Sequence, residues 1–137
     1  MPAPIASRHV STVIRRAPKE VYAYAADPDH LPAWAAGLAQ SEVTRQGDTL
    51  LVDSPMGQVQ VHFVPRNDLG VVDHDVVLPS GTVVTNPMRV LAHPDGAEVL
   101  FTVRQIELTD DEFERDVALV AADLERLREI LESSAPA

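Results

Sequence analysis

Apolar residues recur at intervals of three and four along residues 110–131, close to the end of the chain. They stand at Phe113, Val117, Val120, Leu124, Leu127 and Leu131, and this spacing places them on one stripe of an α-helix. Thr109 and Glu112 have the spacing of a capping box, in which each side chain bonds the backbone N–H of the other residue. The pattern predicts a helix of about 33 Å whose apolar stripe needs a partner surface.

The N-terminal part of the chain combines one alternating pattern with two helical ones. Alternation over residues 8–16 predicts a strand. A helix is expected to begin at Pro18, since the first helical turn tolerates proline, and to end at Asp27-Pro28. A second, short and irregular helix is expected over residues 29–36.

From residue 38 to residue 108 the pattern changes to strands separated by turns rich in Gly, Pro, Asn and Asp. The expected strands cover residues 38–46, 49–54, 58–65, 69–77, 82–92 and 97–108. The short linkers are typical of antiparallel hairpins, and strands and helices do not alternate, which argues against a parallel sheet.

The predicted fold class is therefore α+β. A seven-stranded curved antiparallel sheet is expected to grip the long C-terminal helix, with two short helices between the first and second strands. Residues 1–137 are expected to form a single domain, in which residues 1–7 are a loose leader and residues 133–137 a loose tail.

Two local strings carry a family resemblance. They are Ala17-Pro18-Lys19-Glu20-Val21-Tyr22 and Asp27-Pro28-Asp29-His30-Leu31-Pro32-Ala33-Trp34. Together with the order of the elements, they make the chain resemble the START-like superfamily, also called SRPBCC or helix-grip, and its polyketide cyclase/dehydrase-like members. The resemblance implies a START-like domain with a cavity between sheet and long helix that opens beside the short helices. The superfamily has no universal catalytic residue, so the resemblance assigns none here.

Charge and composition narrow the classes of partner. The chain has a formal net charge of −10 and no cysteine. The negative field repels nucleic acid, and the lack of thiols excludes disulfides and thiolate metal sites. No stretch has the plan of a signal peptide or the length of a membrane span. We therefore expect a cytoplasmic protein without nucleic acid partners.

Chemical motifs are mostly absent, and a metal or other cofactor is not expected. The five histidines show no ligand spacing. In Asp73-His74-Asp75 the alternation of a strand sends both aspartates to the face opposite His74, so the three cannot bind one metal. The aspartates mark the wet face, and His74 is expected to point inward.

The hairpin before His74 has two registers. One places Val59, Val61 and Phe63 beside His74, and the other places Gln60 and His62 there. Apolar content favours the first, which leaves His62 outside. His74 is then either a histidine satisfied by a carbonyl or water at the cavity wall, or an acid/base catalyst for which no buried carboxylate is evident.

Other inward positions complete the candidate site. Trp34 is either a lid anchor or a ligand contact, and Asn86 either repairs the backbone beside Pro87, where a bulge or edge is expected, or contacts ligand. The candidate ligand-binding residues are Trp34, Phe63, His74, Asn86, Met88 and Phe101.

Three functions remain open. The first is binding of a small, mostly apolar ligand, lipid- or polyketide-like, in a cavity between the sheet and the C-terminal helix. The second is a polyketide cyclase or dehydratase reaction with His74 as the acid/base. The third is a protein-interaction role of the co-chaperone type. The sequence is compatible with a monomer or a homodimer.

Overall fold

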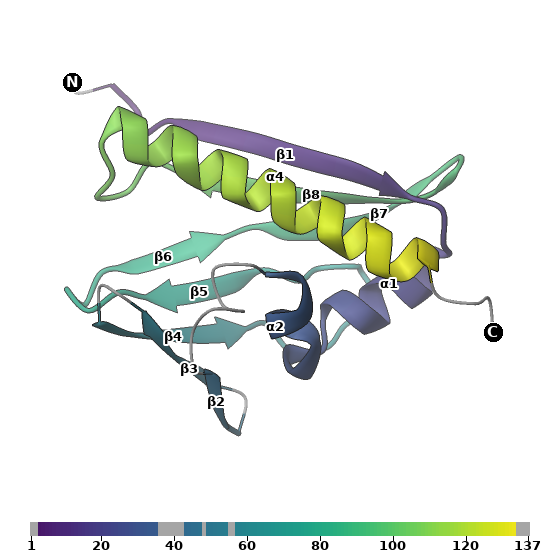
Figure 1. Cartoon of the computed structure of the whole chain (residues 1–137), viewed down its shortest axis with the longest axis horizontal. Coiled ribbons are helices and arrows are strands. Elements are labelled where there is room, and N and C mark those ends of the chain that lie inside the picture. Colours follow the sequence, from purple (N-terminus) through teal and green to yellow (C-terminus); the bar gives the residue numbers. More distant parts are fainter. Residues whose placement is uncertain (1–2, 36–42, 48, 55–56, 134–137) are drawn as a thin grey trace.

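The computed structural model describes residues 3–35, 43–47, 49–54 and 57–133, and within them the chain is α+β (Figure 1). The helices are α1 (Pro18–Ala25), the 3₁₀ turn η1 (Pro28–His30), α2 (Leu31–Trp34) and α4 (Asp110–Ser133). The strands are β1 (Ser7–Ile14), β2 (Val43–Gln46), β3 (Thr49–Ser54), β4 (Gly57–Phe63), β5 (His74–Val77), β6 (Val83–Asn86), β7 (Met88–His93) and β8 (Gly96–Arg104). All strand pairs are antiparallel, as predicted.

The described strands form two sheets rather than the predicted single seven-stranded sheet. One sheet has the order β1-β8-β7 and the other the order β2-β3-β4-β5-β6. The prediction of one strand over residues 82–92 is wrong, because the chain leaves one sheet and enters the other at Pro87, between β6 and β7. Proline has no N–H to donate to a ladder, so a strand cannot run unbroken through it.

A few contacts join the two sheets across this break. Val71 forms an isolated antiparallel bridge with Arg89. Asp73 accepts hydrogen bonds from the backbone N–H of Met88 at 2.8 Å and from Nε of Arg89 at 2.9 Å. The hydrogen bond from Arg89 is the main cause that lowers the pKa of the Asp73 carboxyl. Asp73 and Arg89 therefore lie on the outer face, as the alternation predicted.

Two of the expected strands are shorter than predicted, since the one expected over residues 97–108 ends at Arg104 as β8 and the one expected over residues 69–77 is shortened further. The strand expected over residues 69–77 is reduced to β5, because the side chain of Asn67 takes over the backbone bonds upstream of it. The Asn67 carboxamide accepts from the N–H of Leu69 at 2.9 Å and of Val71 at 3.1 Å, and donates to the carbonyl of Val71 at 2.9 Å. Of the strand expected over residues 38–46, residues 38–42 lie outside the described part of the chain.

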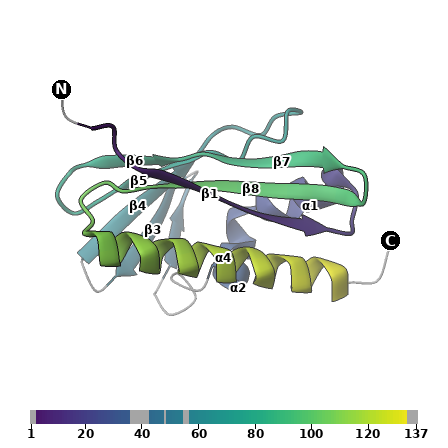
Figure 2. The same ribbon diagram turned by 90° about the horizontal axis from the view of Figure 1, so that it is seen from above.

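Helix α4 begins with the predicted capping box. The N–H of Thr109 donates to Glu112 Oε1 at 2.8 Å, and the N–H of Glu112 donates to Thr109 Oγ1 at 3.2 Å. Figure 2 shows α4 running along β1 on one side of the sheets, with α2 behind it. Polar contacts join α4 to β1 and the residue after it near both ends of the helix. Arg8 forms an ion pair with Glu114 near the N-terminal end. Toward the C-terminal end, Thr12 donates to Glu125 at 2.9 Å and the N–H of Arg15 donates to Glu132 at 3.0 Å.

The apolar stripe of α4 is not buried evenly. Its buried members are Phe113, Leu124, Leu127 and Leu131, at 0–5% exposure. Val117 and Val120, in the middle of the stripe, are only half-buried. The stripe is therefore fully buried at Phe113 and from Leu124 onward, and only partly buried between them. None of the described helices is long and apolar enough to cross a membrane.

Candidate functional site

A cavity of about 320 Å³ lies under the middle of α4, and we call it the Trp34 chamber. Its wall is formed by Leu31, Trp34, Ala35, Val52, Val59, Val61, His74, Val76, Asn86, Phe101, Val103, Asp116, Val120, Asp123 and Leu124. These residues come from α2 and the residue after it, from β3 to β6, from β8 and from α4. The described part of the wall is apolar apart from four polar side chains, which come from β5, β6 and α4: His74, Asn86, Asp116 and Asp123.

A second hollow of about 490 Å³ continues from the first toward the turn between β5 and β6, and we call it the Leu78 chamber. The two chambers share the wall residues Val59, Val76, Asn86, Val103 and Asp116. The two chambers therefore adjoin each other along this shared wall. Asn86 from the sheet and Asp116 from α4 are the polar residues at their junction.

The structure confirms the register that the apolar content favoured. Val61 pairs with Val76 and Phe63 with His74, whereas His62 pairs with Asp75 on the opposite face. His74 thus lies at the start of β5 with its side chain on the cavity face. Its ring centroid is 5.0 Å from that of Phe63 and 5.5 Å from that of Phe101.

The surroundings of His74 fix its protonation. Nδ1 lies 3.1 Å from the carbonyl oxygen of Val72, and since a carbonyl only accepts, Nδ1 carries the hydrogen and Nε2 is left as an acceptor. Burial lowers the pKa of His74, against the smaller opposing effects of the Val72 bond and the charges of Asp73 and Asp75. The imidazole is therefore neutral near pH 7 and can accept a proton or a hydrogen bond at Nε2.

Asp116 is a cavity residue that the sequence analysis missed. It is half-buried and makes no hydrogen bond or ion pair with any described residue. Burial, with nothing to offset it, raises the pKa of its carboxyl. The signal was available, because Asp116 and Asp123 lie two helical turns apart on one flank of the apolar stripe, and both line the Trp34 chamber.

The other predicted site residues divide into two groups. Trp34, Asn86 and Phe101 line the Trp34 chamber together with His74. Trp34 is 3% exposed, and its Nε1 is buried without a hydrogen-bond partner among the described residues. Met88 is 0% exposed and belongs to the core. Phe63 touches the ring of His74, but it lines a different hollow.

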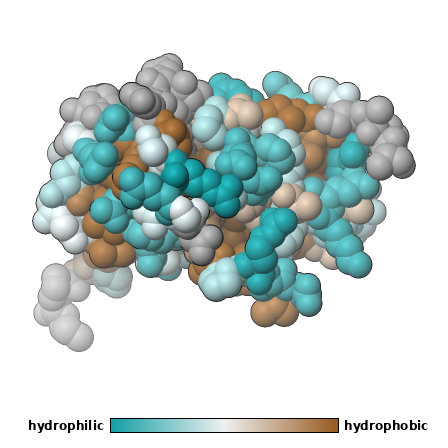
Figure 3. Space-filling model, turned by 90° about the horizontal axis from the view of Figure 1, so that it is seen from below, coloured by the Kyte–Doolittle hydropathy of each residue, from teal (hydrophilic) through white to brown (hydrophobic). Residues whose placement is uncertain are grey.

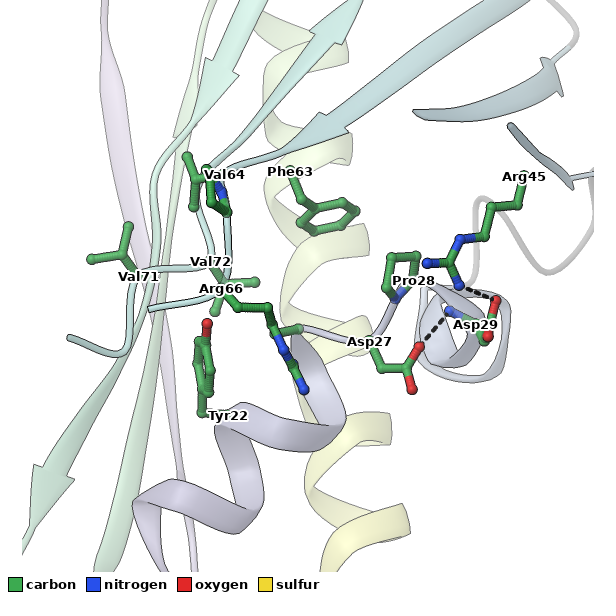
Figure 4. A pocket seen from close by; sticks show the side chains of 12 residues that line it. Tyr22, Asp27, Pro28, Asp29, Arg45, Phe63, Val64, Arg66, Val71 and Val72 are labelled. Atoms are coloured by element: carbon green, nitrogen blue, oxygen red, sulfur yellow. Dashed lines mark hydrogen bonds and ion pairs between the residues drawn. The ribbon is translucent and has the colours of Figure 1, made fainter. Parts of the chain in front are cut away.

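This further hollow, of about 540 Å³, lies beside α1 and η1 and has a more polar wall (Figure 4). Arg45 donates to Asp29 Oδ1 at 3.0 Å, and the guanidinium of Arg66 lies 5.4 Å from the ring centroid of Tyr22. It shares no wall residue with the Trp34 chamber. Phe63, between this hollow and His74, separates the two.

Neither hollow offers a ready metal site. Among the described residues, no group of three histidine, aspartate or glutamate side chains is placed to hold a metal ion.

Comparison with known proteins identifies the fold. No family model matches the chain, and no curated protein matches it in sequence. Among solved structures, the Aha1 dimer from Colwellia psychrerythraea is 18% identical with a TM-score of 0.69, and the match covers 93% of this chain and 96% of that one. Ara h 8.0201 is 8% identical with a TM-score of 0.65, over 96% of this chain and 100% of that one.

A third structure is DynU16, a protein in the dynemicin biosynthetic locus. It is 14% identical with a TM-score of 0.72, and the match covers 97% of this chain but 49% of DynU16. These structures have folds of the helix-grip, or SRPBCC, type. At such low identities they show the fold alone, and this chain has a fold of that type.

Proposed function

We propose that this protein binds a small, mostly apolar molecule, lipid- or polyketide-like, in the cavity between the sheets and α4. The observation that carries the proposal is the Trp34 chamber under α4, whose mostly apolar wall holds only a few polar groups. Ligand pockets have this composition and volumes from about 300 Å³ upward. The similarity to DynU16, a protein of a biosynthetic locus, supports a small molecule as the ligand.

Two experiments test ligand binding. Native mass spectrometry of protein purified from its own host should show a retained small molecule. In vitro, the neutral apolar dye N-phenyl-1-naphthylamine should bind the wild-type protein with increased fluorescence. Val120→Phe should abolish this signal, because Val120 lines the Trp34 chamber. The matched control is Leu119→Phe, on the neighbouring residue, which is 53% exposed.

Circular dichroism must show that both variants remain folded. Equal dye binding by Val120→Phe and Leu119→Phe, or no dye binding by the wild type, would contradict the proposal. The pair of variants separates occupation of the cavity from adsorption of dye to the surface, since each places a phenylalanine side chain on one of two adjacent residues of the same helix.

A second candidate is a cyclase or dehydratase reaction on a polyketide-like substrate, and the neutral His74 beside Asn86 favours it. Nε2 of His74 would take a proton from a carbon next to a carbonyl, and the electron pair would move onto the carbonyl oxygen. Asn86 would donate a hydrogen bond to the resulting enolate. Turnover of a β-keto thioester that survives in His74→Ala would remove this mechanism.

A protein-interaction role has less support. The exposed large hydrophobic side chains of the described residues are distributed over several segments: Ile5 before β1, Val64 and Leu69 between β4 and β5, Val83 on β6, Leu91 on β7 and Leu119 on α4. On the face shown in Figure 3, apolar residues are interrupted by polar ones. A docking surface is usually a contiguous apolar patch. Binding of a small molecule therefore remains the proposed function.

A further inference from the structure

We propose that Asp116 binds a hydrogen-bond donor, an alcohol hydroxyl, in the middle of an elongated ligand whose apolar ends occupy the Trp34 and Leu78 chambers. This inference rests on the proposed binding function and specifies the class of ligand. It follows from the position of Asp116 at the junction of the two chambers, and from the lack of any partner for its carboxyl among the described residues.

The position of Asp116 favours the middle of a ligand rather than its end. Both chambers count Asp116 and Asn86 among their wall residues. Beyond them the wall of the Trp34 chamber is mainly apolar, and that of the Leu78 chamber combines apolar residues with Ser80, Arg104, Glu107 and Glu112. On one side the space reaches Trp34, and on the other it reaches Leu78 and Ile106. A ligand that fills both chambers must therefore pass between Asp116 and Asn86.

The absence of partners indicates that the ligand supplies one. A half-buried carboxyl loses water on folding, and it recovers that loss only through a hydrogen bond or a charge. Asp116 gains neither from the described residues. The side chain of Asn86 also makes no hydrogen bond with any described residue, although its backbone pairs with His74. Two polar groups thus line one junction from opposite walls with their bonding capacity unused.

The chemistry of these two groups selects a hydroxyl. A carboxylate only accepts, whereas a carboxamide both donates and accepts. A hydroxyl can donate to Asp116 and accept from Asn86 at the same time. A ketone in the same place can use Asn86 alone and leaves the carboxylate unpaired, and a hydrocarbon leaves both groups unpaired. A site of this kind discriminates strongly against the analogue that lacks the donor.

The charges along the two chambers disfavour an anionic group. Asp116 and Asp123 line the Trp34 chamber, and Asp116, Glu112 and Glu107 line the Leu78 chamber, where Arg104 is the one basic residue of the described wall. A ligand carboxylate would therefore meet more like charges than opposite ones. The proposed ligand is therefore a neutral alcohol rather than a fatty acid held by its carboxylate.

Three probes with one carbon skeleton test the inference: 6-undecanol, 6-undecanone and undecane. Each displaces N-phenyl-1-naphthylamine from the wild-type protein, and the dissociation constants are compared. We expect 6-undecanol to bind about 10-fold more tightly than the ketone, since each good hydrogen bond contributes roughly that factor. Asp116→Asn should reduce the preference to about 2-fold or less, because an amide can also donate to the ketone.

The matched control is Asp111→Asn, an exposed aspartate in the first turn of the same helix that lines neither chamber. It should keep the wild-type preference for the alcohol. Equal affinity for alcohol and ketone in the wild type, or an unchanged preference in Asp116→Asn, would overturn the inference. In either case dye and undecane would still bind, and the proposed function would stand. If no apolar probe binds, the proposed function itself fails.

The elongated form of the ligand has its own test. Val84 lines the Leu78 chamber and not the Trp34 chamber. Val84→Phe should therefore weaken binding of 6-undecanol several-fold and leave binding of the short alcohol 3-pentanol within about 2-fold of wild type. A variant that weakens both alcohols equally, or neither, would show that the ligand does not extend into the Leu78 chamber.

Discussion

His74 and Asn86 are paired directly across β5 and β6, so their side chains leave the sheet on the same face and enter the same cavity. Side chains in such a pair are about 5 Å apart. The site is therefore built around a pair of polar groups whose spacing is fixed by backbone hydrogen bonds, and a third group, Asp116, is added from the helix.

Stability should fall in mild acid because of His74. Burial lowers its pKa in the folded protein below the ordinary histidine value of about 6.5, so below that pH the unfolded chain binds more protons than the folded one. The free energy of unfolding should decrease as the pH falls from 7.5 to 5.5, by up to about 1.4 kcal/mol per pH unit for this one group. Urea denaturation at pH 7.5, 6.5 and 5.5 measures the free energy of unfolding at each pH.

His74→Gln should flatten that decrease, because glutamine does not titrate. His62→Gln is the control, since His62 lies on the opposite face of the sheet, bonded to Thr49 and Gln60. In one contrary result, the free energy of unfolding falls with pH in His74→Gln as steeply as in the wild type. In another, it stops falling in His62→Gln. Either result would show that His74 is not the group responsible.

Trp34→Phe should be a mild substitution. The indole N–H of Trp34 is buried and has no acceptor among the described residues, and an unpaired buried donor costs about 1–3 kcal/mol. Removal of the N–H offsets part of the packing lost with the smaller ring, so the net change should stay within about 1 kcal/mol. Trp34→Ala, which loses the ring, should cost about 3–5 kcal/mol. If chemical denaturation finds the two variants equally unstable, Nε1 has an acceptor in solution.

Met88→Ala should destabilise the protein without altering ligand binding. Met88 is 0% exposed and lines none of the chambers described. Its truncation therefore leaves a void in the core and should lower the free energy of unfolding by about 2–5 kcal/mol. Thermal denaturation measures the loss, and dye titration below the transition measures binding. A changed dye affinity in the folded variant would restore the role in ligand contact that the sequence predicted for Met88.

Gly70→Ala should cost more than Gly81→Ala. Both glycines have positive φ, +73° and +90° respectively, so both substitutions introduce backbone strain. A Cβ at Gly70 would also lie 2.2 Å from the carbonyl oxygen of Val90, whereas a Cβ at Gly81 meets nothing within 4 Å. We expect Gly70→Ala to lose about 2 kcal/mol more. Equal melting temperatures would contradict the close approach of the chain at Gly70 to β7.

The elements that depend on neighbouring residues were predictable from the sequence. The capping box of Thr109 and Glu112 and the period of the stripe after it define α4 locally. The register that places Phe63 beside His74 followed from the apolar content of alternate positions. The break at Pro87 was predicted only as a bulge or edge, because the sequence of one strand does not say which of two sheets its halves join. Likewise, the shortening of β5 depends on the side chain of Asn67.

The site was predictable only in part, because alternation separates inward from outward residues but does not separate core from cavity. His74, Trp34 and Phe101 line the cavity and Met88 packs in the core, although all four were expected to point inward. Asp116 was missed because an acidic residue on a helix usually faces water. Its role becomes visible only once the middle of α4 is known to lie over a hollow.

Pro87 lies between Asn86 and Met88, whose side chains lie in different parts of the molecule. On one side of it Asn86 faces the cavity, and on the other side Met88 fills the core. Substitutions at position 86 would change what the cavity accepts, whereas those at position 88 would change whether the chain stays folded. In evolution or in the laboratory, selectivity and thermal robustness could therefore be altered independently at two positions only one residue apart.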